Sequence, residues 1–332
     1  MIGSLENAGR VLREHAGKKM LLTVHVNPDG DALGSLAAMG RIAESLGCEI
    51  RICMASRVPD YLDWLPLPWP IYRDPSELGD WAPDLLIVLD CGDAARPGPD
   101  IQALIASERP GMTTLNIDHH LGNPAFAMHN WVESNRSATA EMVGLLAEHL
   151  GLSLAGELGR AVYLGITSDT GNFSFSNTSP EVFALASRIT QAGLRVADFT
   201  QEAENTWSLE RMHLWGKLFA EVSLHHNGRT ALIVVPQKLL DKFGVKRSAL
   251  EGFAAWLRRI RGVRVGVFVR EDGPGRSKVS LRSMGDVDVR VVAASFGGGG
   301  HKAAAGTEVG LPPRETADAV LRAIEELGVF GS

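Results

Sequence analysis

The chain has 332 residues, of which 45% are apolar, and a formal net charge of −6 at pH 7. This length favours two domains, and this composition is typical of a soluble globular enzyme rather than a disordered chain. The negative charge argues against binding of long duplex nucleic acid, which is held mainly through its phosphates. No apolar stretch reaches the ~18 residues of a membrane span and no secretion signal begins the chain, so we expect a cytoplasmic protein with no membrane partner. The three cysteines cannot all pair and form no Cys-x-x-Cys motif, so we expect reduced, mostly buried thiols.

The first part of the chain alternates apolar runs with helical patterns. Buried strands are predicted at residues 18–25, 49–54, 84–89 and 113–117, and helices at 32–46, 137–150 and 158–167. Ser179-Pro180-Glu181 is typical of a helix start, and this helix should continue to about residue 192. Such alternation predicts an α/β fold with a mainly parallel sheet flanked by helices.

The character of the sequence changes after a polar and aromatic helical pattern at residues 198–218. We therefore predict a catalytic, metal-binding domain at 1–190, a helical linker at 191–218 and a smaller mixed α/β domain at 219–332. In this last part, strands are predicted at 231–235, 263–269 and 278–281, and helices at 249–260 and 314–327. It also contains the glycine-dense segment 296–306.

Acids and histidines gather in four short segments that follow or end apolar runs. They are His25-Val-Asn-Pro-Asp29-Gly-Asp31, Asp90 after the strand at 84–89, Asp118-His119-His120, and Asp169 at a predicted helix end. Because ligands of parallel sheets collect outside the carboxyl ends of the strands, we expect these side chains to lie together. Carboxylate and imidazole groups are donors for divalent metals, so the pattern predicts a metal-dependent hydrolase.

The same segments resemble a known family. The Asp118-His119-His120 triplet, preceded by His-x-x-x-Asp-x-Asp and a strand-terminal Asp90 and followed by Asp169-Thr-Gly, resembles the DHH phosphoesterase superfamily. Gly-Gly-Gly-Gly-His-Lys-Ala-Ala-Ala-Gly at 297–306 resembles the signature of its DHHA1 companion domain. The size of the chain makes it similar to bifunctional nanoRNases, which degrade very short oligonucleotides and dephosphorylate 3′-phosphoadenosine 5′-phosphate (PAP). The resemblance implies an active site in the cleft between the two domains.

The resemblance also implies a set of metal ligands. One ion would be held by His25 and Asp29, a second by Asp31, His119 and Asp169, and Asp90 would bridge both. Oxygen-rich ligation with two imidazoles favours Mn²⁺, with Mg²⁺ as the other possibility. Two such ions would activate a shared hydroxide that attacks phosphorus.

Other residues are predicted to act on the substrate. We expect His120, the bridging Asp90 and Asp118 to form the catalytic set, with His120 donating to a phosphate oxygen while Asp118 orients a neighbouring group. Substrate binding is assigned to two sets of residues. One lies at the start of the helix at 137–150, where the amides and Arg136 would bind a phosphate, and the other lies in the second domain. These residues are Arg136, Ser137, Arg282, Ser283, Gly298, Gly299, Gly300 and His301.

Several functions stay open at this point. The expected partners are short oligonucleotides, dinucleotides and PAP, and the family resemblance suggests a homodimer. The alternatives are a single-strand exonuclease that acts on longer strands, a phosphodiesterase of linear or cyclic dinucleotides, and a non-catalytic nucleotide-binding module. The dependence of activity on substrate length would separate the first alternative from the nanoRNase, and lost metal ligands would indicate the last.

Overall fold

The chain folds into two compact units, Met1–Thr206 and Trp207–Ser332, and each is described by itself. The computed structural model describes residues 3–107, 109–204 and 207–330. Helix α7 (Val196–Glu204) belongs to the first unit and α8 (Leu209–Ala220) to the second. The helical pattern predicted over 198–218 is therefore two helices, and Ser208 caps the second of them. Residues 205 and 206 of that prediction lie outside the described residues.

The first unit contains a six-stranded parallel sheet with the strand order β3-β2-β1-β4-β5-β6. Its strands are β1 (Lys19–Thr23), β2 (Glu49–Cys53), β3 (Ile71–Tyr72), β4 (Leu85–Leu89), β5 (Thr113–Asp118) and β6 (His129–Val132). All five residues of β4 are buried, as expected of a parallel strand that is covered on both faces. From β1 the chain adds β2 and β3 on one side of the sheet, and then adds β4, β5 and β6 on the other side. The boundary between β1 and β4 is the switch point of the strand order, where such sheets bind ligands.

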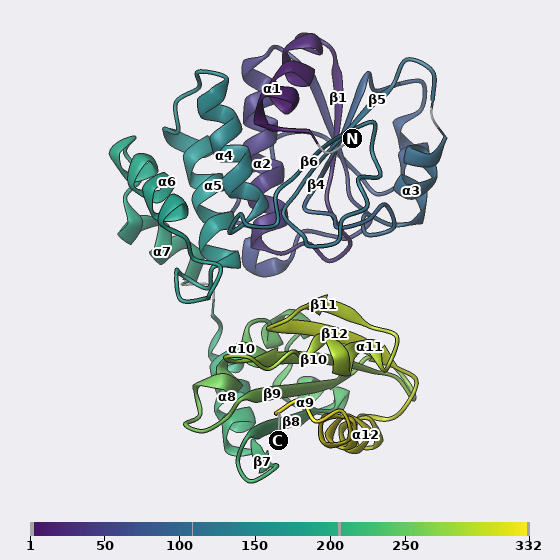
Figure 1. Ribbon diagram of the computed structural model, residues 1–332, viewed down its shortest axis with the longest axis vertical. Helices are drawn as coiled ribbons and strands as arrows, with labels where there is room; N and C mark the ends of the chain where they lie inside the picture. Colours follow the sequence, from purple (N-terminus) through teal and green to yellow (C-terminus); the bar gives the residue numbers. More distant parts are fainter. Residues whose placement is uncertain (1–2, 108, 205–206, 331–332) are drawn as a thin grey trace. The chain divides into compact units, whose positions relative to one another are not determined.

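Helices cover both faces of this sheet (Figure 1). Helices α1 (Leu5–Glu14), α2 (Gly30–Ser45) and α4 (Thr139–His149) pack on one face, and α3 (Pro99–Ala106) packs on the other. Helix α5 (Gly156–Asp169) packs on α2 and α4, and α6 (Pro180–Gln191) follows it. Helices α2 and α5 approach closely at Gly34, where a Cβ atom would lie only 2.6 Å from the carbonyl oxygen of Ala161. As predicted, Ser179 caps α6 and Pro180 is its first residue.

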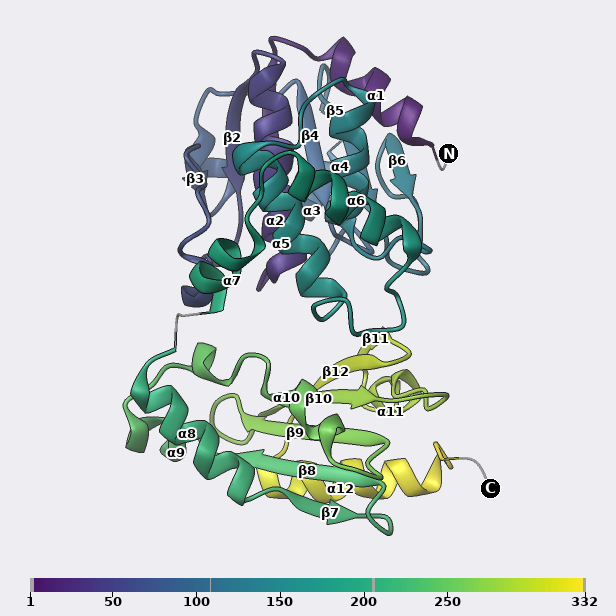
Figure 2. The same ribbon diagram turned by 90° about the vertical axis from the view of Figure 1, so that its left-hand side faces the viewer.

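The second unit is built on a mixed six-stranded sheet with the order β11-β12-β10-β9-β8-β7 (Figure 2). Its strands are β7 (Ser223–His225), β8 (Thr230–Val235), β9 (Val265–Glu271), β10 (Ser277–Ser283), β11 (Gly299–His301) and β12 (Ala304–Val309). Only β8 and β9 are parallel among these pairs of described strands. Helices α11 (Arg290–Ala294) and α12 (Pro313–Glu326) cover one face, and α8, α9 (Gln237–Phe243) and α10 (Phe253–Trp256) cover the other.

Some elements differ from the sequence prediction. The helix predicted at 249–260 consists of three short pieces, the 3₁₀ helix Arg247–Leu250, α10 and the 3₁₀ helix Leu257–Arg259. The glycine-dense segment, where no strand was predicted, forms edge strand β11 and the start of β12. Within the part of the chain that the structure describes, none of the helices is both long and apolar enough to cross a membrane.

Candidate metal centre

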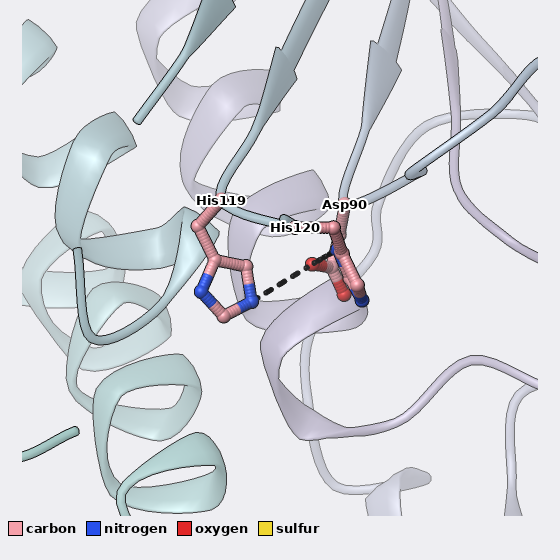
Figure 3. A group of neighbouring side chains, drawn as sticks. All are labelled: Asp90, His119 and His120. Carbon is pink, nitrogen blue, oxygen red and sulfur yellow. Dashed lines mark ion pairs between the residues drawn. The ribbon is translucent and has the colours of Figure 1, made fainter. Parts of the chain in front are cut away.

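Asp90 lies at the centre of the candidate site, directly after β4 at the switch point of the first sheet. Its side chain is buried, and its backbone has a φ of +57°, a left-handed conformation that non-glycine residues adopt rarely and often at functional sites. Its Oδ1 lies 3.7 Å from His119 Nε2 and 3.7 Å from His120 Nδ1 (Figure 3). Its Oδ2 lies 3.5 Å from His25 Nε2. One carboxylate therefore faces three imidazole rings.

A first group of donors is made by His25, Asp29 and Asp90. His25 Nε2 lies 3.9 Å from Asp29 Oδ1, and its Nδ1–H donates to the Val26 carbonyl oxygen at 3.1 Å. This bond to a carbonyl leaves Nε2 without its proton in the neutral ring, as a metal ligand requires. Asp29 Oδ1 also caps α2 by accepting from the amides of Asp31 and Ala32.

A second group is made by Asp31, His119 and Asp169. His119 Nε2 lies 3.8 Å from Asp31 Oδ2 and 3.5 Å from Asp169 Oδ2. Its Nδ1–H donates to the Arg136 carbonyl oxygen at 3.2 Å, so Nε2 again faces the carboxylates. Helices α2 and α5 thus bring acids to the same place as the end of β5.

The spacing of these donors suits ligands that share an ion. In each group, one ligand atom per residue lies within 4.8 Å of the others. The imidazole-to-carboxylate distances of 3.5–3.9 Å are longer than those of good hydrogen bonds. Two ligands that each lie about 2.1 Å from one ion are about 3–4 Å apart. The geometry therefore fits divalent ions at both groups.

The electrostatics of the cluster point the same way. Burial, reinforced by the charges of Asp90 and Asp169, raises the pKa of Asp31 well above its ordinary value. Burial also raises the pKa of Asp169 to about 7, although the charge of His119 opposes it. Burial would raise the pKa of Asp90 too, but the contact with His25 and its charge outweigh burial and lower this pKa. Since divalent cations would relieve the repulsion among these carboxylates, the residues present fit such ions.

Helix α4 supports the cluster through its first residues. The amides of Thr139 and Ala140 donate to Asp31 Oδ2 and Oδ1, both at 2.8 Å, and the Thr139 hydroxyl donates to Asp90 Oδ1 at 2.9 Å. The prediction that the amides at this helix start bind a phosphate is therefore corrected, because the amides of Thr139 and Ala140 donate to the Asp31 carboxylate. Thr139 was not predicted as a site residue.

Arg136 and Ser137, predicted to bind substrate, already have protein partners. Arg136 Nε lies 2.6 Å from Glu133 Oε2, and its Nη1 lies 3.1 Å from Glu141 Oε1. The Ser137 amide donates to Glu141 Oε2 at 2.7 Å, and its buried hydroxyl donates to the Asn177 carbonyl oxygen at 2.6 Å. These contacts position the start of α4 beside the cluster.

His120 is held by a second, separate set of bonds. Its Nδ1–H donates to Asp118 Oδ1 at 2.7 Å, and Asp118 Oδ2 accepts from Asn123 Nδ2 at 2.7 Å. Burial alone would lower the pKa of His120, but this bond and the charges of Asp90 and Asp118 raise it to about 9. Asp118 thus orients His120. Asn123 was not predicted as a site residue, because its position in the sequence shows no motif.

The remaining predicted site residues lie in the second unit. Arg282 on β10 is paired with Ala304 on β12, and Ala304 is paired with His301 on β11. The buried Ser283 hydroxyl lies 2.7 Å from the Val287 carbonyl oxygen and 3.2 Å from that of Lys302, so it stabilises a turn.

Gly298, Gly299 and Gly300 differ in what surrounds them. A Cβ at Gly298 would lie 2.2 Å from the Gly306 carbonyl oxygen, and one at Gly300 would lie 2.5 Å from that of Ala304. These two glycines are required by the packing of the chain itself. A Cβ at Gly299 would meet no heavy atom of the described residues within 4 Å. Gly299 is therefore the glycine of this set that has space for a ligand.

This fold and this site together define the class of the protein. The first unit has a parallel sheet with a cluster of carboxylates and imidazoles at its switch point, and a mixed α/β unit follows it. This arrangement is typical of a two-domain metal-dependent phosphoesterase. Residues 19–166 match the model of the DHH family, N-terminal domain, and residues 230–327 match that of the DHHA1 domain. The chain belongs to the DHH family, as its motifs predicted, and is a hydrolase of phosphate esters.

Known relatives match over nearly the full chain. The bifunctional oligoribonuclease and PAP phosphatase NrnA of Thermus thermophilus is 33% identical over 308 residues, which cover 92% of this chain and 89% of the relative. The Bacillus subtilis protein of the same name is 28% identical over 312 residues, covering 93% and 94%. The crystal structure of an exopolyphosphatase-related protein from Bacteroides fragilis superposes with a TM-score of 0.88 at 27% identity, covering 97% and 96%.

Proposed function

We propose that this enzyme hydrolyses oligoribonucleotides of two to a few residues to mononucleotides, and PAP to AMP. The observation that carries the proposal is the gathering of all six predicted ligand side chains at the switch point of the first sheet. The names of the relatives, which match both units of the chain, supply the substrate class. The net charge of −6 supports short substrates rather than long duplexes.

Two divalent ions fit the cluster better than one. We assign one ion to each group of donors and let both share Asp90, because its Oδ2 faces His25 and its Oδ1 faces His119. The six side chains of the two groups are His25, Asp29, Asp31, Asp90, His119 and Asp169. Four carboxylates with two imidazoles favour Mn²⁺, with Mg²⁺ as the alternative because it prefers oxygen ligands.

The protein side chains divide the work of hydrolysis. Bound divalent ions would supply a water of lowered pKa and offset charge on the phosphoryl group. His120 acts on the substrate: its Nδ1–H donates to Asp118, and Nε2 is the nitrogen that would donate to a phosphate oxygen. Because Asn123 holds Asp118 in turn, the ring is oriented before the substrate arrives.

The second unit supplies the contacts to the nucleotide. Arg282 and His301 offer donors to a phosphate, and Gly299 leaves room beside them. Gly298 and Gly300 contribute indirectly, by letting β11 pack. We assign a smaller part to Arg136, since its guanidinium is shared between two carboxylates.

The test is hydrolysis of 5′-phosphorylated oligoribonucleotides of two to about ten residues, and of PAP, with Mn²⁺. The proposal predicts fast cleavage of dimers that falls with length, turnover of PAP, and loss of both activities in Asp90→Asn. Equal or faster cleavage of the longer strands would indicate an exonuclease instead. No metal-dependent turnover of any of these substrates would refute the proposal.

A further inference from the structure

The loop between β4 and α3 passes along the candidate metal centre. Its residues 91–98 connect the end of β4 to the start of α3. A Cβ at Gly92 would lie 3.2 Å from His120 Cβ, so the start of the loop lies beside this ring. Near the end of the loop, the carbonyl oxygen of Arg96 accepts from the Val26 amide at 2.8 Å. The loop therefore extends from His120 to the segment that supplies the first group of metal donors.

The backbone of this loop is held by bonds that leave the Arg96 side chain out. Asp93 Oδ1 accepts from the amides of Ala95 at 2.8 Å and Arg96 at 3.1 Å, which closes a turn. Asn123 Nδ2 donates to the carbonyl oxygen of Cys91 at 3.1 Å and fixes the start of the loop. The backbone of Arg96 is thus positioned beside the metal centre without use of its guanidinium.

The guanidinium of Arg96 keeps its donors for a ligand. The residue is exposed, and within residues 3–107, 109–204 and 207–330 its side chain makes no hydrogen bond or ion pair. Arg136, the arginine predicted to bind substrate in this unit, differs because Glu133 and Glu141 share its guanidinium. Arg96 is therefore better suited than Arg136 to bind an anion at this place.

The charge of Arg96 acts on the groups around the loop. Burial and the charge of Arg96 act to lower the pKa of His120, although contacts with carboxylates raise this pKa to about 9. Burial raises the pKa of the Cys91 thiol, and the charge of Arg96 opposes that change. Such effects weaken with distance and are screened by solvent. They agree with the course of the loop, which brings Arg96 close to the His120 ring.

A cation at this position suits the chemistry of the proposed reaction. During hydrolysis, negative charge is spread over the nonbridging oxygens of the phosphate, and positive groups aimed at these oxygens stabilise the transition state. A guanidinium presents several N–H donors in a plane and can bind two phosphate oxygens at once. Because Arg96 lies near His120, both side chains can bind the same phosphate.

We propose that Arg96 is a catalytic residue whose guanidinium binds nonbridging oxygens of the phosphate that is hydrolysed. This inference rests on the proposed function for its substrates, and it adds a phosphate contact that the first unit itself supplies. The contact is to the transferred phosphate and not to the nucleoside. It should therefore serve oligoribonucleotides and PAP alike.

Inorganic phosphate is a direct probe of this contact, because hydrolysis of PAP releases the transferred group in that form. Its binding to the full chain is measured by calorimetry with saturating Mg²⁺. Arg96→Gln should weaken phosphate binding by about 10- to 100-fold, the effect of losing one bond to a charged group. Arg96→Lys keeps the charge and should lose less. Both variants should bind Mg²⁺ itself like wild type, because Arg96 holds none of the metal donors.

Arg109→Gln is the matched control. Arg109 is also an exposed arginine of a loop in the first unit, but its loop precedes β5, whereas the metal centre lies where the strands end. This variant should bind phosphate like wild type. The inference is overturned if wild type does not bind phosphate, if Arg96→Gln binds it normally, or if Arg109→Gln or Mg²⁺ binding is weakened to the same extent.

Turnover gives a second test of the same contact. Arg96→Gln should lower kcat/KM for PAP and for a 5′-phosphorylated dinucleotide by similar factors, and a loss confined to one substrate would contradict a contact to the transferred phosphate. Failure of the proposed function would look different. Phosphate binding would then depend on Arg96 as described, but neither substrate would be hydrolysed by the wild-type protein.

Discussion

Replacing Thr139 with valine removes one hydrogen bond from the centre of the metal cluster and little else. The Thr139 hydroxyl donates to Asp90 Oδ1 at 2.9 Å, and both residues are buried. The Thr139 amide, which donates to Asp31, belongs to the backbone and is retained. Valine has nearly the shape of threonine, so the packing around α4 should persist.

The size of the effect follows from the charge of the acceptor. A hydrogen bond to a charged group contributes about 1.5–3 kcal/mol, which corresponds to about 10- to 150-fold in an equilibrium constant. Groups that orient metal ligands in this way typically change metal affinity or activity by about 10- to 100-fold. We therefore expect Thr139→Val to weaken Mn²⁺ binding by about 10- to 100-fold.

The assay is a calorimetric titration with Mn²⁺, accompanied by the dependence of hydrolysis on Mn²⁺ concentration. Thr139→Ser is the control, because it keeps the hydroxyl and should behave like wild type. If Thr139→Val matches wild type in both measurements, the Thr139 hydroxyl does not orient Asp90 and the reasoning fails.

Three further predictions concern other parts of the first unit. His120→Asn should lower kcat by about 100-fold or more while the Mn²⁺ content stays near that of wild type; equal loss of both would contradict its role on the substrate. Gly34→Ala should lower the free energy of unfolding in urea by about 1–3 kcal/mol, because its Cβ would lie 2.6 Å from the Ala161 carbonyl oxygen. The control is Gly216→Ala in α8 of the second unit, where a Cβ meets no described atom within 4 Å and stability should not fall. An unchanged urea midpoint for Gly34→Ala would disprove the prediction. Burial raises the pKa of Cys53 to about 12, so only about one thiol in 10,000 is ionised at pH 8. Ellman's reagent should reach this thiol only after unfolding, whereas the half-exposed Cys48 can react in the folded protein. In a Cys48→Ser variant, rapid reaction of the folded protein would be inconsistent with the burial of Cys53.

The sequence predicted much of the first unit because its central strands are continuous apolar runs. In a parallel sheet, the residues after such runs must meet at one edge, which is why His25, Asp90 and His119 could be placed together. Short edge strands such as β3 and β6 carry too few residues for a pattern and were missed. Helix α1 was missed too, although Ala8, Val11 and Leu12 give it a buried face.

The support of the cluster could not be predicted in the same way. Thr139 lies 49 residues from Asp90 in sequence, and a threonine at a helix start looks like an ordinary cap. Asn123 bonds Asp118 from within an irregular loop. Such bonds depend on how the chain returns to the sheet, which periodicity does not encode.

The glycine-dense segment shows a different limit. Its composition suggested close approach of a ligand at every position, but Gly298 and Gly300 are required by contacts within the chain. Strand pairing decides which glycine faces outward, and a run of four glycines has no alternation of apolar and polar side chains that would predict that pairing. The cytoplasmic location and the homodimer stay predictions.

Anomalous diffraction from crystals grown with Mn²⁺ tests the central claim most directly. We expect two peaks in the first unit, one among His25, Asp29 and Asp90 and the other among Asp31, His119 and Asp169, with Asp90 contacting both. In Asp90→Asn, the peaks should weaken together. Peaks elsewhere, or none at these side chains, would contradict the assignment of this cluster as the metal centre of the enzyme.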